Sequence, residues 1–157
     1  MQIRRATVDD IDLLIRLRID YLLEDNKVER LHDVEGVSCK LRDYFAKWIP
    51  DAGFIALIAE DDSSVQSTAF LSIVERPPRT TASSFLVGTV YNVFTYPEHR
   101  RKGIALQVMQ ALIKEAESLG VASVDLLATE EGKPLYDKLG FQTANYVPMR
   151  LRLLTSQ

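Results

Sequence analysis

The sequence contains a single cysteine, Cys39, so neither an intrachain disulfide nor a cysteine-based metal site can be built within one chain. A lone thiol on a predicted helix acts either as a small packed residue or as a catalytic nucleophile. Apolar runs are also short, and none approaches the roughly 18 residues that a membrane-spanning helix needs. Residues 1–5 lack the apolar core of a signal peptide. We therefore expect a cytoplasmic protein that does not associate with membranes.

A strong excess of one charge is missing as well. The chain carries 19 Lys and Arg against 22 Asp and Glu, a formal net charge of −3. This acidic balance argues against a nucleic acid as the partner. A length of 157 residues without repeats or low-complexity tracts predicts one domain over residues 1–157.

Two familiar phosphate-binding motifs are absent, the nucleotide P-loop G-x-x-x-x-G-K-[ST] and the dinucleotide fingerprint G-x-G-x-x-G. The chain instead places Arg100, Arg101, Lys102 and Gly103 between a strand-like run and a strongly helical one. Backbone N–H groups at a helix N-terminus attract anions, and a glycine lets a ligand approach the main chain closely. This junction predicts a cradle for a diphosphate.

Hydrophobic periodicity predicts an α/β protein with the order β-α-α-β-β-β-α-β-α-β. The strands are expected at residues 3–6, 54–59, 67–74, 86–95, 121–128 and 141–154, and the helices at residues 7–23, 38–48, 104–119 and 130–139. Ser38 is expected to cap the second helix, and Gly140 to follow the last one as its C′ residue. The middle strands should pair antiparallel, and residues 86–128 should form one parallel right-handed crossover. The result is a mixed central sheet with helices on both faces.

Two segments of the chain resemble one family. Residues 93–105 look like the acyl-CoA signature [QR]-x-x-G-x-[GA] of the GNAT superfamily of acyl-CoA N-acyltransferases, and residues 134–141 look like its Y-x-K-L-G-F segment. One helix and one strand separate the two, as in that family. The resemblance implies a three-layer fold with a sheet of six to seven strands. It also implies an N-acetyltransferase that moves an acetyl group from acetyl-CoA to a primary amine through a tetrahedral intermediate, without a metal.

The resemblance also implies where acetyl-CoA lies. The strands at 86–95 and 122–128 should splay apart, and the pantetheine arm should pair with the main chain of one of them as β-augmentation does. The pyrophosphate should lie over the backbone amides of residues 101–105. The implied cofactor-binding residues are Val93, Phe94, Thr95, Arg100, Arg101, Lys102, Gly103, Ile104 and Ala105.

Tyr136 is the implied general acid, since its phenol stays protonated at neutral pH and can donate to the leaving thiolate. A purely packing tyrosine is the alternative. The general base is left unassigned, because residues 85–96 contain no Asp or Glu where many family members place a glutamate. Glu75 and His32 are candidates, and a water chain or an already neutral amine would need neither.

The acceptor is open between a small-molecule and a peptide amine. The acidic segment at residues 24–36 suits a cationic amine, or is simply a solvated loop. Aromatic side chains form either an acceptor pocket or part of the core: Tyr21, Tyr44, Trp48 and Tyr91. A competing hypothesis is an acyl-CoA-binding regulatory module that has lost turnover. O-acyl transfer, a longer acyl chain and a homodimer through the C-terminal strands also stay open.

Overall fold

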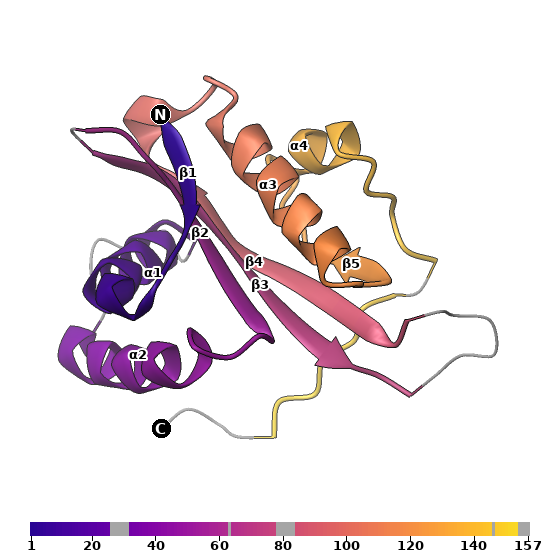
Figure 1. The fold of residues 1–157 in the computed structure, drawn as a ribbon, viewed down its shortest axis with the longest axis horizontal. Coiled ribbons are helices and arrows are strands. Elements are labelled where there is room, and N and C mark those ends of the chain that lie inside the picture. The colour runs from indigo at the N-terminus through magenta and orange to yellow at the C-terminus, as the bar shows by residue number, and fades with distance from the viewer. Residues whose placement is uncertain (26–31, 63, 78–83, 146, 154–157) are drawn as a thin grey trace. The chain divides into compact units, whose positions relative to one another are not determined.

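The protein is described by a computed structural model that covers residues 1–25, 32–62, 64–77, 84–145 and 147–153. The chain divides into two compact units, Met1–Leu127 and Ala128–Gln157, and each is described by itself. The first unit holds all the strands and three α-helices (Figure 1), and the second holds one short helix, α4 (Lys133–Lys138).

The first unit is built on a five-stranded mixed sheet with the strand order β1-β2-β3-β4-β5. The first four strands pair antiparallel, and β5 joins β4 in parallel, as the element order predicts. The strands are β1 (Gln2–Arg5), β2 (Phe54–Glu60), β3 (Val65–Glu75), β4 (Leu86–Thr95) and β5 (Ser123–Asp125). The sheet therefore has five strands where six to seven were expected.

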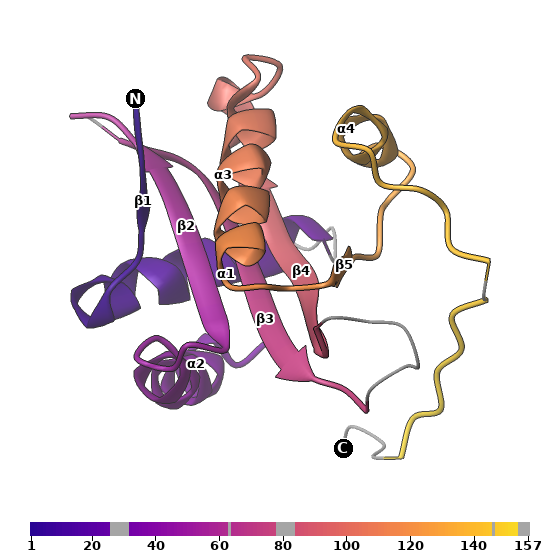
Figure 2. The same cartoon turned by 45° about the vertical axis from the view of Figure 1, so that its right-hand side comes forward.

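Helices cover both faces of this sheet. The helices α1 (Ile11–Asp25) and α2 (Val34–Trp48) lie on one face, and α3 (Ile104–Ser118) lies on the other (Figures 1 and 2). Successive side chains of β2 point to opposite faces of the sheet, and those on both faces are buried. One core joins α1 and α2 to the sheet through residues such as Leu14, Leu17, Phe45, Phe54 and Phe70.

The helix α3 forms because its apolar residues recur at helical spacing. Val108, Met109, Leu112 and Ala116 lie on one stripe and are 0–2% exposed, against β2, β3 and β4. This stripe holds the helix against the sheet, with its start and the predicted phosphate cradle following the C-terminal end of β4 along the chain.

The second helix begins earlier than its spacing predicts. Asp33 is the N-cap, and its carboxylate accepts a hydrogen bond of 2.8 Å from the backbone N–H of Gly36. Ser38 lies inside the helix instead, where its hydroxyl donates to the carbonyl of Val34. Cys39 on the same helix is exposed, so it is not a packed residue.

The predicted C-terminal strand at residues 141–154 is the largest difference. The described residues 141–145 and 147–153 form no ladder, and β5 spans three residues rather than eight. Apolar and polar side chains do alternate here, but the apolar members, Val147, Met149, Leu151 and Leu153, are 82–93% exposed. A period of two shows that a segment can form a strand, and a paired edge is still needed to hold it there.

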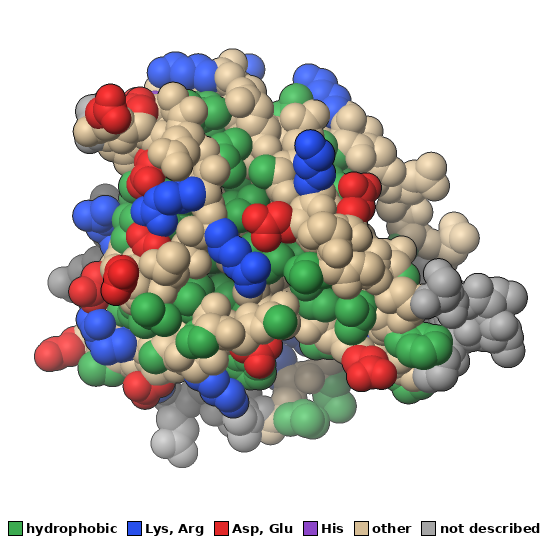
Figure 3. Space-filling model, viewed as in Figure 1, with side chains coloured by type: hydrophobic (Ala, Val, Ile, Leu, Met, Phe, Trp, Pro, Cys, Tyr) green, Lys and Arg blue, Asp and Glu red, His purple; other side chains and the backbone are tan. Residues whose placement is uncertain are grey.

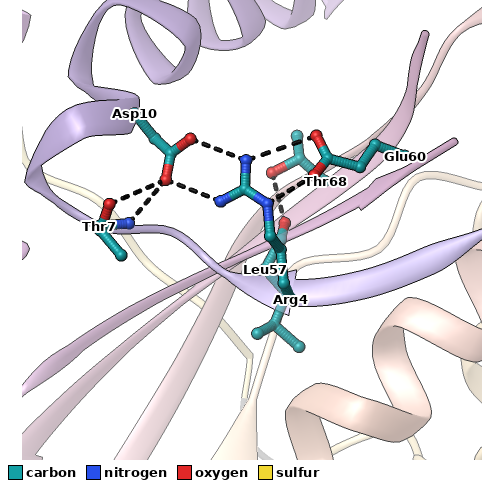
Figure 4. Close-up of polar contacts among 6 residues, drawn as sticks. All are labelled: Arg4, Thr7, Asp10, Leu57, Glu60 and Thr68. Carbon is teal, nitrogen blue, oxygen red and sulfur yellow. Dashed lines mark hydrogen bonds and ion pairs between the residues drawn. The ribbon is translucent and has the colours of Figure 1, made fainter. Parts of the chain in front are cut away.

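An ionic network joins β1 to the segment that leads into α1. The guanidinium of Arg4 lies between the carboxylates of Asp10 and Glu60, and Asp10 also accepts hydrogen bonds from the backbone and hydroxyl of Thr7 (Figure 4). On the face in Figure 3, basic and acidic side chains are interspersed. No helix within the described residues is long and apolar enough to cross a membrane.

Candidate functional site

The loop before α3 turns its backbone amides toward solvent. Arg101 and Gly103 both have positive φ angles, 58° and 77°, with Lys102 between them. Backbone N–H groups converge in such turns and form anion-binding concavities called nests. In the part of the chain that the structure describes, the N–H groups of residues 101–105 donate to no other protein group. The loop is exposed, while Ile104 anchors the helix start in the core at 7% exposure.

The three cations of this loop do different things. Arg100 forms an ion pair with Glu24 at the end of α1, and its Nε donates to the carbonyl of Thr95 at 2.9 Å. Its side chain therefore ties the loop to α1 and β4. Arg101 and Lys102 are exposed and form no ion pair with the described carboxylates. These two side chains are available to an anion at the nest.

Strand β4 leaves one edge open next to this loop. It pairs with β3 along its length, but its parallel pairing with β5 covers only residues 87–89. Among the described strands, none pairs with that edge at Val93, Phe94 or Thr95. Alternate backbone groups of a strand point to its two sides. The main chain at residues 90–95 thus has an edge without a strand partner among the described strands.

A β-bulge interrupts β4 just before this edge. Thr68 and Phe70 of β3 are two residues apart, but their partners Phe94 and Tyr91 are three apart, so β4 carries one extra residue. Asn92 lies there with a φ of 55° and is 1% exposed. The bulge was not predicted from the sequence. The one residue there that could have indicated it is Asn92, since asparagine tolerates positive φ and is uncommon in the middle of an apolar strand.

Two tyrosine hydroxyls meet where α2 faces β4. The hydroxyls of Tyr44 and Tyr91 are 2.8 Å apart, and the ring of Tyr91 packs against Phe54 and Phe70. Burial, reinforced by the hydrogen bond to Tyr44, raises the pKa of Tyr91 well above its usual range. Tyr91 therefore stays protonated and cannot act as a general base at neutral pH. Phe54 and Phe70 belong to the core, Tyr91 packs against it partly buried, and Tyr44 is the most exposed of the four.

Tyr136 lies in the second unit, near the end of α4. The N–H of Phe141 donates to its carbonyl at 3.0 Å, and the N–H of Gly140 donates to the carbonyl of Asp137 at 3.1 Å. These two bonds form a Schellman motif, with Gly140 at C′ as expected, and the rings of Tyr136 and Phe141 provide its hydrophobic contact, 5.9 Å apart. The Y-x-K-L-G-F segment thus ends the helix, and the ring of its tyrosine packs on Phe141 there.

Neither candidate base lies at the bulge. Glu75 pairs with Leu86 at the far end of β4, eight residues before Phe94, which is roughly 26 Å along a strand. His32 is exposed just before α2. The acidic segment at residues 24–36 lies partly outside the described residues, since 26–31 are not among them. The geometry therefore brings together the nest and the open edge of β4, without a carboxylate on β4.

The family now follows from comparison with known proteins. Residues 52–143, more than half of the chain, match the family model described as the acetyltransferase (GNAT) domain. The chain belongs to the GNAT acetyltransferase family. The match spans β2 to α4, and so includes the open strand edge, the nest and the helix stop. No curated protein matches the chain at a significant level.

Solved structures agree with this membership. A predicted acetyltransferase from Clostridium acetobutylicum, crystallised with acetyl-CoA, is 28% identical and has a TM-score of 0.83, covering 97% of this chain and 96% of its own. Two others share the fold at lower identity. A ribosomal-protein-alanine N-acetyltransferase from Brucella melitensis is 18% identical, with a TM-score of 0.73 and coverage of 98% and 100%. A glucosamine-6-phosphate N-acetyltransferase from Arabidopsis thaliana is 15% identical, with a TM-score of 0.70 and coverage of 97% for both chains.

Proposed function

We propose that this GNAT protein transfers the acetyl group of acetyl-CoA to a primary amine. The observation that carries the proposal is the nest of backbone amides at residues 101–105, next to the open edge of β4. A nest suits a pyrophosphate, and an open strand edge suits the amide-bearing pantetheine arm. In this proposal Val93, Phe94 and Thr95 bind pantetheine through their main chain. The pyrophosphate is held by the amides of Arg101, Lys102, Gly103, Ile104 and Ala105, with Arg100 bracing the loop.

The transfer needs no covalent enzyme intermediate. The neutral amine nitrogen attacks the thioester carbonyl carbon, and a backbone N–H near Phe94 or Thr95 stabilises the tetrahedral oxyanion. The new C–N bond forms, the C–S bond breaks, and the amine loses one proton to water. The departing thiolate needs one proton, for which the likeness of residues 134–141 to the family's motif proposes the hydroxyl of Tyr136, reprotonated from solvent. A protein base is not required where the amine arrives neutral.

The fold leaves the acceptor undefined. The two N-acetyltransferases named above share this fold, and one is named for a protein alanine and the other for a sugar phosphate. The acceptor must therefore be inferred from side chains of this chain rather than from its architecture.

A binding module without turnover is the second candidate. It is favoured by one observation, that residues 85–96 contain no Asp or Glu to deprotonate an incoming amine. Such a protein would bind acetyl-CoA and report its concentration rather than consume it.

Two measurements on the purified full chain test the proposal. Thiol release from acetyl-CoA, followed with a thiol-reactive dye across a panel of primary amines, reports turnover. Calorimetry with CoA and acetyl-CoA reports binding. Amine-dependent thiol release supports the transferase, and tight binding without release for any amine identifies the binding module. Failure to bind either nucleotide contradicts both.

A further inference from the structure

A positive charge lies beside the bulge of β4 and forms no ion pair with a described carboxylate. Arg18 on α1 is half-buried, and its Nη1 donates to Oδ1 of Asn92 at 3.0 Å. Its guanidinium carbon lies 5.2 Å from the centre of the Tyr21 ring. No described carboxylate forms an ion pair with it, although seven other basic–acidic pairs lie within 4 Å. Partial burial of a charge is costly without a counter-ion.

Asn92 binds this cation with its side-chain oxygen and leaves its side-chain nitrogen without a partner among the described residues. Arginine has only donors, so the side-chain oxygen of Asn92 must face it and the amide nitrogen must point elsewhere. That nitrogen is buried and has no partner among the described residues. The residue combines a positive φ, an unsatisfied donor and 1% exposure. Such accumulated cost in one side chain is typical of functional positions.

The location links this pair to the proposed reaction. Asn92 directly precedes Val93, the start of the edge proposed to hold pantetheine. The charge of Arg18 opposes the rise in the pKa of Tyr91, and Tyr91 shares a hydrogen bond with the solvent-exposed Tyr44. The guanidinium thus lies between α1, α2 and β4, on the face of the sheet that carries α1 and α2.

We infer that Arg18 binds a carboxylate of the acceptor, so that the substrate is a small amine that also carries a carboxylate. The inference rests on the proposed acetyltransferase function and names its substrate class. A guanidinium recognises a carboxylate through paired N–H donors, and such charge-assisted bonds are strong. From Asn92 to Phe94 is roughly 7 Å along the strand, so the amine and the carboxylate should be separated by only a few carbons.

A phosphate fits the same position less well. A phosphate monoester carries close to two negative charges at neutral pH, and Arg18 supplies one positive charge. Acidic groups lie nearby, since Asp25 interacts with Tyr21 and Asp20 accepts a hydrogen bond from Tyr96 at 2.5 Å. A singly charged carboxylate balances Arg18 and is repelled less by these groups than a phosphate with twice the charge.

The experiment compares amines that carry a carboxylate with their uncharged carboxamides, and each kcat/KM is expressed per neutral amine, because the carboxamide also lowers the pKa of the amine. Thiol release from acetyl-CoA is measured with glycine, β-alanine and γ-aminobutyrate, each beside its own carboxamide, and with phosphoethanolamine. The expected result is a kcat/KM at least about tenfold higher for one of the acids than for its amide. The difference should arise mainly from a lower KM for the acid. Equal use of each acid and its amide, or a preference for phosphoethanolamine, would overturn the inference.

Variants on α1 separate this role from a structural one. Arg18→Gln should bring the ratio of kcat/KM for the acid to kcat/KM for its amide down to about one, and Arg18→Lys should restore part of the preference for the acid. Arg16→Gln is the control, because Arg16 is exposed on the same helix. A preference that persists in Arg18→Gln contradicts the assignment.

Binding gives a readout that does not depend on turnover. If no amine releases thiol, the proposed acetyl transfer is contradicted, but carboxylate binding at Arg18 can still be tested. The test is then the rise in Tm of the protein on addition of each acid and of its amide. A rise with an acid alone, lost in Arg18→Gln, supports carboxylate binding at Arg18. The same Tm for acid and amide overturns it.

Discussion

The carboxylate of Asp10 accepts two hydrogen bonds of 2.8 Å from the guanidinium of Arg4, one at each oxygen. The same guanidinium donates to Glu60 at 2.5 Å, so one side chain joins β1, the end of β2 and the segment before α1 (Figure 4). Bidentate pairs of this kind are stronger than single contacts at a surface. The network holds the start of α1, the helix that carries Arg18.

We expect Asp10 to make folding sensitive to acid. The hydrogen bonds from Arg4, more than any other cause, hold its pKa below the usual 3.8. Its contribution to stability is therefore full above that value and is lost as pH falls through the lowered pKa. Asp10→Asn should reduce the free energy of unfolding at neutral pH by about 1–3 kcal/mol. Urea unfolding between pH 7 and about 3 measures both effects.

The neighbouring Asp12 provides the control. It pairs with Arg42, but its side chain is 81% exposed, so Asp12→Asn should change stability by less than about 0.5 kcal/mol. A variant Asp10→Asn that kept the wild-type loss of stability in acid would contradict the assignment.

We expect Gly103 to contribute to CoA binding as well as to the backbone conformation before α3. Gly103 and Gly120 flank α3, with φ angles of 77° and 73°, and a Cβ added to either would meet nothing within 4 Å. Replacing either by alanine should therefore cost a similar amount, about 1 kcal/mol, from backbone strain. Only Gly103→Ala places a methyl group at the nest, so only this variant should bind CoA more weakly. Thermal unfolding and calorimetry separate the two effects, and equal losses of CoA affinity would exclude the nest as the pyrophosphate site.

We expect Tyr136→Phe to lower kcat at least about tenfold with little change in the affinity for acetyl-CoA. The substitution keeps the ring that packs on Phe141 and removes only the hydroxyl. Stopped-flow or steady-state thiol release measures kcat, and calorimetry measures affinity. Phe141→Leu is the matched control, because it loosens the ring contact and leaves the hydroxyl in place. Unchanged turnover in Tyr136→Phe would reduce the residue to a packing role.

Local patterns in the sequence predict β4 and α3 closely. The bounds of β4 agree with the expected residues 86–95, because alternating burial and a following proline define both ends. The start of α3 at Ile104 follows equally from the stripe of Val108, Leu112 and Ala116. In both cases the signal lies within the segment itself.

Features that depend on distant partners could not be predicted in this way. Arg18 and Asn92 are 74 residues apart, and nothing near either one indicates their hydrogen bond. The motif at residues 100–105 likewise gives no sign that Arg100 contacts Glu24 and Thr95. The alternation at residues 147–153 indicates a strand and cannot say whether an edge is available to pair with it.

The extra residue in β4 has a consequence for how this protein balances stability against activity. A chain lacking Asn92 would align Thr68 with Phe94 and Phe70 with Tyr91 in one continuous ladder. It would also lose a strained φ angle and a buried, unsatisfied amide. A more regular sheet is therefore one deletion away. The longer strand keeps a strained residue and an interrupted ladder at the position where the chemistry of this protein is proposed to occur.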